Sequence, residues 1–439
     1  MTDVAAVVMA GGLGTRMKSA VPKHLHDLLG RRVVDWVLET ARELGADPLI
    51  VVASPETRRA YDGVSVAVQE EARGTGDAVA AARGALAGYT GAVLVLDAAA
   101  PLLTPALLEE LVAAHARERA DVTVLTIEPD EPLPYGRVVR GDDGSVQAIV
   151  EEADATPEQR AIRELNTSIY VFEADALWRA LEQLDDGNAQ GELYLTDAVR
   201  HIVDAGGRTA AVRADDAKQA IGINNRVELA AAARALRDRI NERHMLNGVT
   251  IVDPSSTWIS ADVELEPDVV VHPFTVLGGR TKVGTGTEIG SHVVAIDAEI
   301  GERVLIGPFC YLRPGTVLER DAKAGTFVEI KNSRIGARTK VPHLSYIGDA
   351  EVGEDTNVAA GNITVNFPHQ EGRPKGRTTI GKNVRTGVQN AFVAPVTVGD
   401  DAWIAAGSVI TKDVPPGALA VARARQENKE GYARRERDD

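Results

Sequence analysis

Hydrophobic residues recur at every sixth position along much of the C-terminal part of the chain, between about 263 and 411. A branched aliphatic residue, often followed by glycine, keeps this spacing from Ile300 to Leu318, and the spacing returns from Phe392 to Ile410. A period of six fits neither the 3.6-residue turn of an α-helix nor a heptad. It predicts a solenoid in which each unit makes one short strand and one turn, with the aliphatic side chain pointing into a narrow core.

The first 226 residues show a different pattern, in which short apolar runs alternate with amphipathic stretches. The predicted strands are 4–9, 49–53, 93–96 and 122–127, and the predicted helices are 33–44 and 107–119. This alternation favours a mostly parallel sheet with helices on both faces. Ligands of such sheets usually bind beyond the carboxyl ends of the strands.

Residues 227–248 are rich in Ala, Leu, Arg and Glu, and they contain no Gly or Pro before Gly248, which predicts a connecting helix. We therefore expect three parts: an α/β domain over 1–226, a linker helix over 227–250, and the solenoid with a charged tail over 251–439.

Bulk composition narrows the possible functions. The chain has 439 residues and a net charge of −16, which argues against nucleic acid as a main partner because phosphate backbones favour basic surfaces. The single cysteine, Cys310, allows no intrachain disulfide and fits a reducing cytoplasm. The N-terminus lacks a basic, apolar leader, and no apolar run is long enough to span a membrane. We expect a cytoplasmic protein with no membrane partner.

A glycine-rich turn follows the first predicted strand: residues 10–17 read Ala-Gly-Gly-Leu-Gly-Thr-Arg-Met, and Pro22-Lys23 comes shortly after. Glycines let backbone N–H groups approach phosphate oxygens closely, and Arg16 and Lys23 would neutralise a triphosphate. A glycine-rich turn alone is also common for steric reasons. The motif predicts a phosphate site only because the cations accompany it.

A second constellation lies inside the repeat. Arg313 and Lys331 are 18 residues apart, which is one full coil of a three-sided solenoid, so both cations would stack on one face and clamp a sugar phosphate. His343 follows twelve residues after Lys331, and an imidazole is suited to accept a proton near neutral pH. Taken singly, a histidine in a solenoid turn is more often a surface hydrogen-bonding group, and the two cations could simply form surface ion pairs.

Together these motifs resemble the sugar-nucleotide pyrophosphorylases. Joined to the repeat, the chain is most similar to the bifunctional N-acetylglucosamine-1-phosphate uridyltransferase/glucosamine-1-phosphate acetyltransferases, from Val4 to about Gly431. The resemblance implies a Rossmann-like α/β nucleotidyltransferase domain, then a left-handed parallel β-helix of hexapeptide repeats. It also implies Mg²⁺ as cofactor, UTP and acetyl-coenzyme A as co-substrates, and a homotrimer with acetyltransferase sites between neighbouring solenoids.

The resemblance assigns roles residue by residue. In the N-terminal part it implies that Arg16 and Lys23 are catalytic and that Asn224 helps to hold Mg²⁺. The implied nucleotide and sugar contacts are Met9, Ala10, Gly11, Gly12, Gln69, Gly74, Thr75, Gly136, Glu151, Asn166 and Asn224. In the repeat it implies that His343 is the general base. The implied sugar-phosphate contacts are Arg313, Lys331, Tyr346 and Asn357, and the implied acetyl-coenzyme A contacts are Ala360, Asn366, Phe367, Ala406 and Arg423.

The chain departs from this pattern at the metal site. The family has Gly-Asp-x-Pro-Leu after the central strand, and its Asp is a metal ligand, whereas residues 97–102 here read Asp-Ala-Ala-Ala-Pro-Leu. Ala99 stands in the ligand position. Asp97, two residues earlier, would face the same side of an extended strand but start about 6.6 Å away. The family's Gly-Thr-Gly-His also ends in Asp77 here. We expect uridyl transfer to be slow or absent.

The solenoid departs less from the family's motifs than the metal site does. The family's Asn-Tyr-Asp-Gly is Asn366-Phe367-Pro368-His369, followed by a loop about three residues longer than usual, and its Ser-Asp-Thr is 388–390, Val-Gln-Asn. The leading prediction is acetylation of glucosamine 1-phosphate, with a weakened uridyltransferase domain. One alternative is a nucleotidyltransferase for another sugar 1-phosphate whose solenoid only assembles or regulates. The other alternative is a non-catalytic sugar-nucleotide-binding scaffold.

Overall fold

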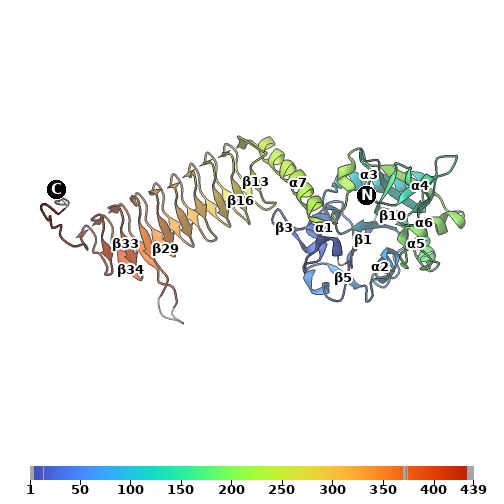
Figure 1. The fold of residues 1–439 in the computed structure, drawn as a ribbon, viewed down its shortest axis with the longest axis horizontal. Helices are drawn as coiled ribbons and strands as arrows, with labels where there is room; N and C mark the ends of the chain where they lie inside the picture. The colour runs from blue at the N-terminus through green and yellow to red at the C-terminus, as the bar shows by residue number, and fades with distance from the viewer. Residues whose placement is uncertain (1–3, 13, 369–371, 373, 433–439) are drawn as a thin grey trace, which may run out of the picture. The chain divides into compact units, whose positions relative to one another are not determined.

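A computed structural model describes residues 4–12, 14–368, 372 and 374–432. The chain divides into two compact units, Met1–Leu236 and Arg237–Asp439. Figure 1 shows the first as a sheet flanked by helices and the second as a stack of short strands.

The first unit is built on one mixed sheet with the strand order β11-β7-β10-β6-β1-β4-β5. The strands are β1 (Val4–Ala10), β4 (Leu49–Ala53), β5 (Ser65–Val68), β6 (Ala92–Asp97), β7 (Val122–Ile127), β10 (Leu165–Glu173) and β11 (Thr209–Arg213), and the antiparallel ribbon β8 (Arg137–Arg140) and β9 (Val146–Val150) joins at β10. All neighbours along this order are parallel except β10, which runs antiparallel to both β6 and β7. The predicted α/β class is confirmed, and the reversed central strand was not predicted.

Helices cover both faces of this sheet. They are α1 (Val33–Glu43), α2 (Thr75–Ala81), α3 (Pro105–Glu118), α4 (Pro157–Arg160), α5 (Ala174–Leu181) and α6 (Leu195–Asp204). Successive residues of a strand face opposite sides, so Ala6 and Val8 pack with α1 and α3, whereas Ala5 and Val7 pack with α2, α5 and α6. Strands buried on both faces explain the continuous apolar runs in the sequence.

The helix α7 (Arg226–Leu246) contains the division between the two units. Ala232 and Leu236 pack with Met17 in the first unit. In the second unit, Asn241 donates hydrogen bonds from Nδ2 to the carbonyls of Pro254 and Thr257, which ties the end of α7 to the start of the solenoid.

The second unit is a parallel β-helix with three faces. Face 1 holds β12 (Thr250–Ile251), β15 (Val270–Val271), β18 (Glu288–Ile289), β21 (Leu305–Ile306), β24 (Lys323–Thr326), β27 (Lys340–His343), β32 (Arg385–Thr386), β35 (Trp403–Ile404) and β37 (Leu419–Ala420). Face 2 holds β13 (Trp258–Ile259), β16 (Val276–Gly278), β19 (Val294–Ile296), β22 (Tyr311–Leu312), β25 (Glu329–Lys331), β28 (Tyr346–Gly348), β30 (Ile363–Val365), β33 (Ala391–Val393) and β36 (Val409–Ile410). Face 3 holds β14 (Glu264–Leu265), β17 (Lys282–Val283), β20 (Glu299–Ile300), β23 (Val317–Leu318), β26 (Arg334–Ile335), β29 (Ala350–Val352), β31 (Thr378–Ile380) and β34 (Val396–Val398).

The six-residue period predicted this architecture correctly. The aliphatic residues of the repeat, such as Ile300, Leu312 and Phe392, are buried, and each strand pairs in parallel with the strand one coil later. The turn between faces 1 and 2 carries a residue with positive φ in successive coils, among them Phe274, His292, Phe309 and Phe327. Their rings stack in a ladder with centroids 4.9, 4.7 and 5.3 Å apart.

Candidate functional site

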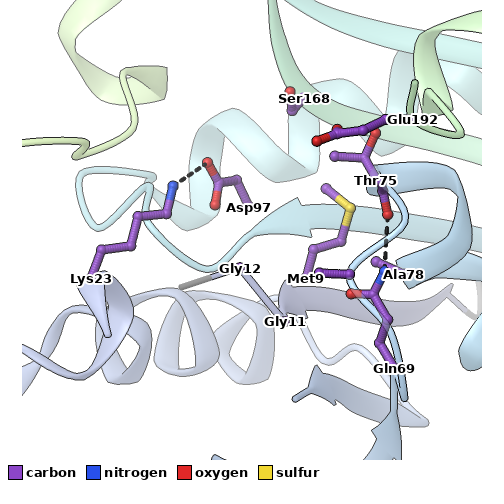
Figure 2. Close-up of a pocket in the computed structure, with 12 residues that line it drawn as sticks. Met9, Gly11, Gly12, Lys23, Gln69, Thr75, Ala78, Asp97, Ser168 and Glu192 are labelled. Carbon is purple, nitrogen blue, oxygen red and sulfur yellow. Dashed lines mark hydrogen bonds and ion pairs between the residues drawn. The ribbon is translucent and has the colours of Figure 1, made fainter. Parts of the chain in front are cut away.

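One cavity of about 240 Å³ lies at the carboxyl ends of β1 and β6 (Figure 2). Its lining includes the predicted residues Met9, Gly11, Gly12, Lys23, Gln69, Gly74 and Thr75, together with Asp97, Ser168 and Glu192. Ala10, also predicted, is buried and lines neither this cavity nor its neighbour. The cavity lies where parallel strands end, as expected for a ligand site in such a sheet.

Gln69 is held in a fixed orientation in this cavity. Its Nε2 donates to the carbonyl of Gly74 at 3.1 Å and to the Asp77 carboxylate at 2.9 Å. Asp77 also accepts from Arg73 at 2.8 Å and does not line the cavity, so the departure at position 77 acts through Gln69. A Cβ on Gly11 would lie 2.4 Å from Gln69 Oε1, which explains the glycine there.

A second cavity of about 160 Å³ adjoins the first, and Asp97 and Ser168 line both. Its lining includes the predicted residues Arg16, Gly136, Glu151, Asn166 and Asn224. Burial raises the pKa of Glu151, although Thr196 donates a hydrogen bond to its carboxylate at 3.2 Å. The structure thus brings the predicted nucleotide and sugar contacts together in two connected hollows.

The segment after β6 is a turn, not the extended strand that the sequence suggested. Ala100 N donates to Asp97 O at 3.1 Å, and Ala99 N donates to Asp97 Oδ1 at 2.9 Å. Ala99 is fully buried and lines neither cavity, whereas Asp97 lines both. The Asp97 carboxylate thus contacts the backbone of position 99 directly, through one hydrogen bond.

The oxygen donors nearest to this turn suit a Mg²⁺ ion. Asn224 Oδ1 accepts from Arg16 at 2.9 Å, and both residues line the second cavity with Asp97. Among the described residues, no group of three or more His, Cys, Asp or Glu side chains forms a metal cage. Mg²⁺ commonly keeps several waters and binds through one or two carboxylates plus substrate phosphates, so Asp97 and Asn224 fit such an ion.

Ser168 is a site residue that the sequence did not reveal. It adopts φ 60° where the pairing of β10 with β7 shifts register, between Asn166 and Tyr170. This irregularity turns Ser168 toward both cavities. Since positive φ is uncommon for serine and no local motif announces the shift, the sequence held no usable signal for it.

In the solenoid, the predicted phosphate cations lie on adjacent coils at the edge between faces 2 and 3. Arg313 N donates to Ile330 O at 2.8 Å, so Arg313 and Lys331 are neighbours across the β22–β25 pair. Arg313 Nη1 also pairs with Glu329 at 2.8 Å. A Cβ on Gly348, the next-coil partner of Lys331, would lie 2.2 Å from the Tyr346 hydroxyl, which therefore extends along this edge.

Lys375 joins this cluster and was not predicted as a site residue. A hydrogen bond with Lys331 and repulsion by its charge lower the pKa of Lys375, and the Asp349 carboxylate opposes this effect. Lys375 lies three residues before β31, where face 3 resumes, and its position near the end of a long loop could have marked it. Arg313, Lys331 and Lys375 give this edge three cations.

His343 lies at the turn between faces 1 and 2, at the head of a row that descends one residue per coil. Gly361 N donates to His343 O at 3.3 Å, Gln389 N to Ala360 O at 2.8 Å, and Gly407 N to Val388 O at 2.9 Å. The row is His343, Ala360, Val388 and Ala406. We call it the corner row. At its far end Arg423 Nη1 donates to Ala406 O at 2.9 Å.

Three other predicted residues lie away from the corner row. Asn366 and Phe367 follow β30 at the edge between faces 2 and 3, where Asn366 donates to the Asp349 carboxylate. Phe367 is exposed and lines a hollow of about 600 Å³ with Lys375. Asn357 bridges Lys340 and Arg385 on face 1. His369, the last residue of the segment that departs from the family pattern, lies outside the described residues. One chain therefore carries the predicted acetyl-coenzyme A contacts on two separate edges.

Comparison with known proteins agrees with this two-part construction. Residues 6–193 match the family model of the MobA-like NTP transferase domain, and 377–412 match the hexapeptide repeat of succinyl-transferase. The chain is 48% identical over 458 aligned positions to the bifunctional protein GlmU of Streptomyces coelicolor, covering 99% of this chain and 94% of that protein. It is 46% identical over 465 positions to that of Mycolicibacterium vanbaalenii (100% and 94%), and 44% over 452 positions to that of Caldanaerobacter subterraneus (98% and 98%).

The fold and the two sites define a bifunctional transferase, in which a nucleotidyltransferase domain precedes a hexapeptide-repeat acyltransferase. The resemblance stated from the sequence is confirmed at this level. The chain belongs to the GlmU family of bifunctional uridyltransferase–acetyltransferase enzymes. Neither alternative, the regulatory solenoid or the non-catalytic scaffold, is favoured by these relatives. No helix within the described residues is long and apolar enough to cross a membrane.

Proposed function

We propose that the corner row is the acetyl-transfer site and that His343 is its general base. The amine of glucosamine 1-phosphate attacks the thioester carbonyl of acetyl-coenzyme A, a C–N bond forms, and the C–S bond breaks. The imidazole of His343 accepts the proton that the amine loses, and the thiolate leaving group takes up a proton. The observation that carries this proposal is the alignment of His343 with Ala360, Val388 and Ala406, one residue per coil.

The length of the corner row supports this assignment. Neighbouring strands are about 4.8 Å apart, so three steps from His343 to Ala406 span about 14 Å. That span suits an extended pantetheine arm with its thioester at His343. Ala360 and Ala406 are small, which leaves room for a ligand along the corner. On the sugar side, Arg313, Lys331 and Lys375 would hold the phosphate.

The test is thiol release from acetyl-coenzyme A in the presence of glucosamine 1-phosphate. General-base catalysis contributes roughly 10²- to 10⁴-fold, so His343→Ala should lower kcat by that factor with little change in KM. His292→Ala is the matched control, because His292 is an exposed histidine at the same edge but outside the corner row, and we expect its thiol release within about twofold of wild type. No thiol release by the wild-type protein would refute the proposal.

We also propose that the N-terminal unit transfers uridylate from UTP to N-acetylglucosamine 1-phosphate, at a reduced rate. Gly11, Gly12 and Lys23 would hold the triphosphate, Gln69 the uracil, and Glu151 and Asn166 the amino sugar. A bound Mg²⁺ would neutralise charge on the phosphates. Supporting this, the two connected cavities contain the cations Arg16 and Lys23 on the side shared with Asp97. Release of pyrophosphate that requires Mg²⁺, UTP and the sugar phosphate together would bear this out.

The assembly that we propose is a homotrimer packed through face 2. The outward residues that open its strands are largely apolar, with Val276, Tyr311, Ile363 and Val409 all exposed, whereas face 3 carries ion pairs such as Lys282–Glu264. An exposed apolar face of this kind marks an interface. Separation of the acetyl-coenzyme A contacts onto two edges supports sites completed between chains. Light scattering should give a mass of three chains. We place the enzyme in the cytoplasm, where both co-substrates occur.

A further inference from the structure

We propose that Asp97 supplies the carboxylate ligand for the divalent cation of the N-terminal site, in place of the residue at 99. This inference rests on the proposed uridyl transfer. It starts from the position of the Asp97 side chain: among the described residues, it is the only carboxylate that lines both the nucleotide cavity and the sugar cavity. A cation held by this carboxylate would neutralise phosphate charge in either cavity.

The two oxygens of the Asp97 carboxylate have different surroundings. Oδ1 accepts the Ala99 N–H, which fixes the rotation of the side chain. Oδ2 points away from the turn, and its nearest cation, Lys23 Nζ, is 3.9 Å away, too far for a strong pair (Figure 2). One oxygen therefore orients the carboxylate, and the other remains open to the cavity.

The turn also brings the second oxygen donor into place. Ile223 N donates to Ala99 O at 2.8 Å, so the 222–224 segment is bound to the turn itself. A Cβ on Gly222 would lie 3.0 Å from Asp97 Oδ2, which shows how closely the segment approaches the carboxylate. Asn224, two residues on, has its side-chain oxygen directed by Arg16 and its backbone N–H held by Glu228.

Position 99 does not contribute a donor to either cavity. The Ala99 side chain is fully buried, and its backbone N–H and carbonyl are used in holding the turn and the 222–224 segment. The result is a site with one carboxylate and one amide oxygen, the remaining positions being left for water and phosphate oxygens. This composition is usual for Mg²⁺ bound together with a nucleotide.

The test is binding of Mn²⁺, measured by electron paramagnetic resonance with Mn²⁺ alone and with UTP present. Asp97→Asn keeps an oxygen acceptor for the Ala99 N–H, so the turn is preserved while the charge of the ligand is lost. We expect at least a tenfold weaker Mn²⁺ affinity for this variant. Glu192→Gln, which removes another carboxylate from the nucleotide cavity, should change the affinity less than about twofold.

An unchanged Mn²⁺ affinity in Asp97→Asn, with tighter metal-free UTP binding, would overturn the inference and leave Asp97 as a charge partner of Lys23. An equal loss in Glu192→Gln would overturn it too, because the effect would then be general electrostatics. The proposed function is judged separately, by formation of the UDP-sugar. Asp97-dependent Mn²⁺ binding without that product would contradict the proposed function alone, and product formation with an Asp97-independent metal would contradict this inference alone.

Discussion

Replacing Gly11 by alanine should separate base recognition from phosphate binding in the N-terminal unit. The new Cβ would lie 2.4 Å from Gln69 Oε1, which is closer than real Cβ atoms approach a neighbour, so the carboxamide has to move. Moving it breaks the bonds of Nε2 to Gly74 O and to the Asp77 carboxylate. The Asp77 carboxylate keeps its hydrogen bond from Arg73, so its charge is not left without a partner.

The magnitude follows from the hydrogen bonds involved. A bond to a charged group contributes roughly 1.5–3 kcal/mol and a neutral one roughly 0.5–1.5 kcal/mol, so the free energy of unfolding of this unit should fall by about 2 kcal/mol or more. Gln69 also leaves the position from which it would contact uracil. Losing one or two neutral hydrogen bonds to the base weakens UTP binding by about 1–3 kcal/mol, or roughly 5- to 150-fold.

Calorimetric titration with UTP and with tripolyphosphate tests this. We expect Gly11→Ala to lose affinity for UTP while tripolyphosphate binding changes less than about threefold, because the new Cβ is directed at Gln69 and the substitution keeps the backbone N–H of residue 11 and the Lys23 side chain. Gly12→Ala is the control for stability, since among the described residues outside its chain neighbours a Cβ there meets no atom within 4 Å. Gly11→Ala with wild-type UTP affinity would show that Gln69 does not read the base, and the reasoning would fail.

Three further predictions follow from particular residues. Burial, with a smaller effect of the Arg243 charge, lowers the pKa of His244 to about 4. The free energy of unfolding of the solenoid should therefore reach its full value above pH 6.5 and fall by about 3 kcal/mol between pH 6.5 and pH 4. Urea unfolding of His244→Leu should lack this pH dependence. Ser168→Gly should raise the melting temperature, because it relieves roughly 1 kcal/mol of left-handed strain, and a fall would mean that its hydroxyl matters more. Ala99→Asp should lower the melting temperature and should not raise Mg²⁺-dependent pyrophosphate release, because residue 99 is fully buried and lines neither cavity; a raised rate would show that position 99 can hold the metal ion and would contradict our account of the metal site.

The solenoid was predictable because the side chains that point into its narrow core have to be apolar. Residues such as Ile300 and Leu312 are buried aliphatic side chains, and the six-residue spacing between such positions gives the number of residues in each strand and turn. The predicted strands of the N-terminal unit were likewise placed within a residue or so, since buried parallel strands read as apolar runs. The reversed direction of β10 left no such trace, because an antiparallel strand buried on both faces has the same apolar composition.

The candidate sites were less predictable where tertiary structure decides them. The sequence predicted one phosphate site for the glycine turn and its cations, whereas Lys23 lines the first cavity and Arg16 lines the second. It also treated residues 97–99 as extended, whereas a turn begins at Asp97, the last residue of β6. Nothing local indicates that Ser168 adopts a positive φ, or that Lys375 returns to Lys331 after a long loop. These contacts join residues far apart in the sequence, and one sequence carries no record of such pairing.

The number of coils in the corner row sets the distance between its two ends. Each coil advances the row by one strand spacing, about 4.8 Å, so the separation of His343 from Ala406 can change only in whole steps. Removing one coil between them would shorten the row to about 10 Å and leave the inward packing of every remaining coil intact. An enzyme of this kind could therefore adapt to a shorter or longer thioester carrier by losing or gaining whole coils, while the shape of each remaining coil stays the same.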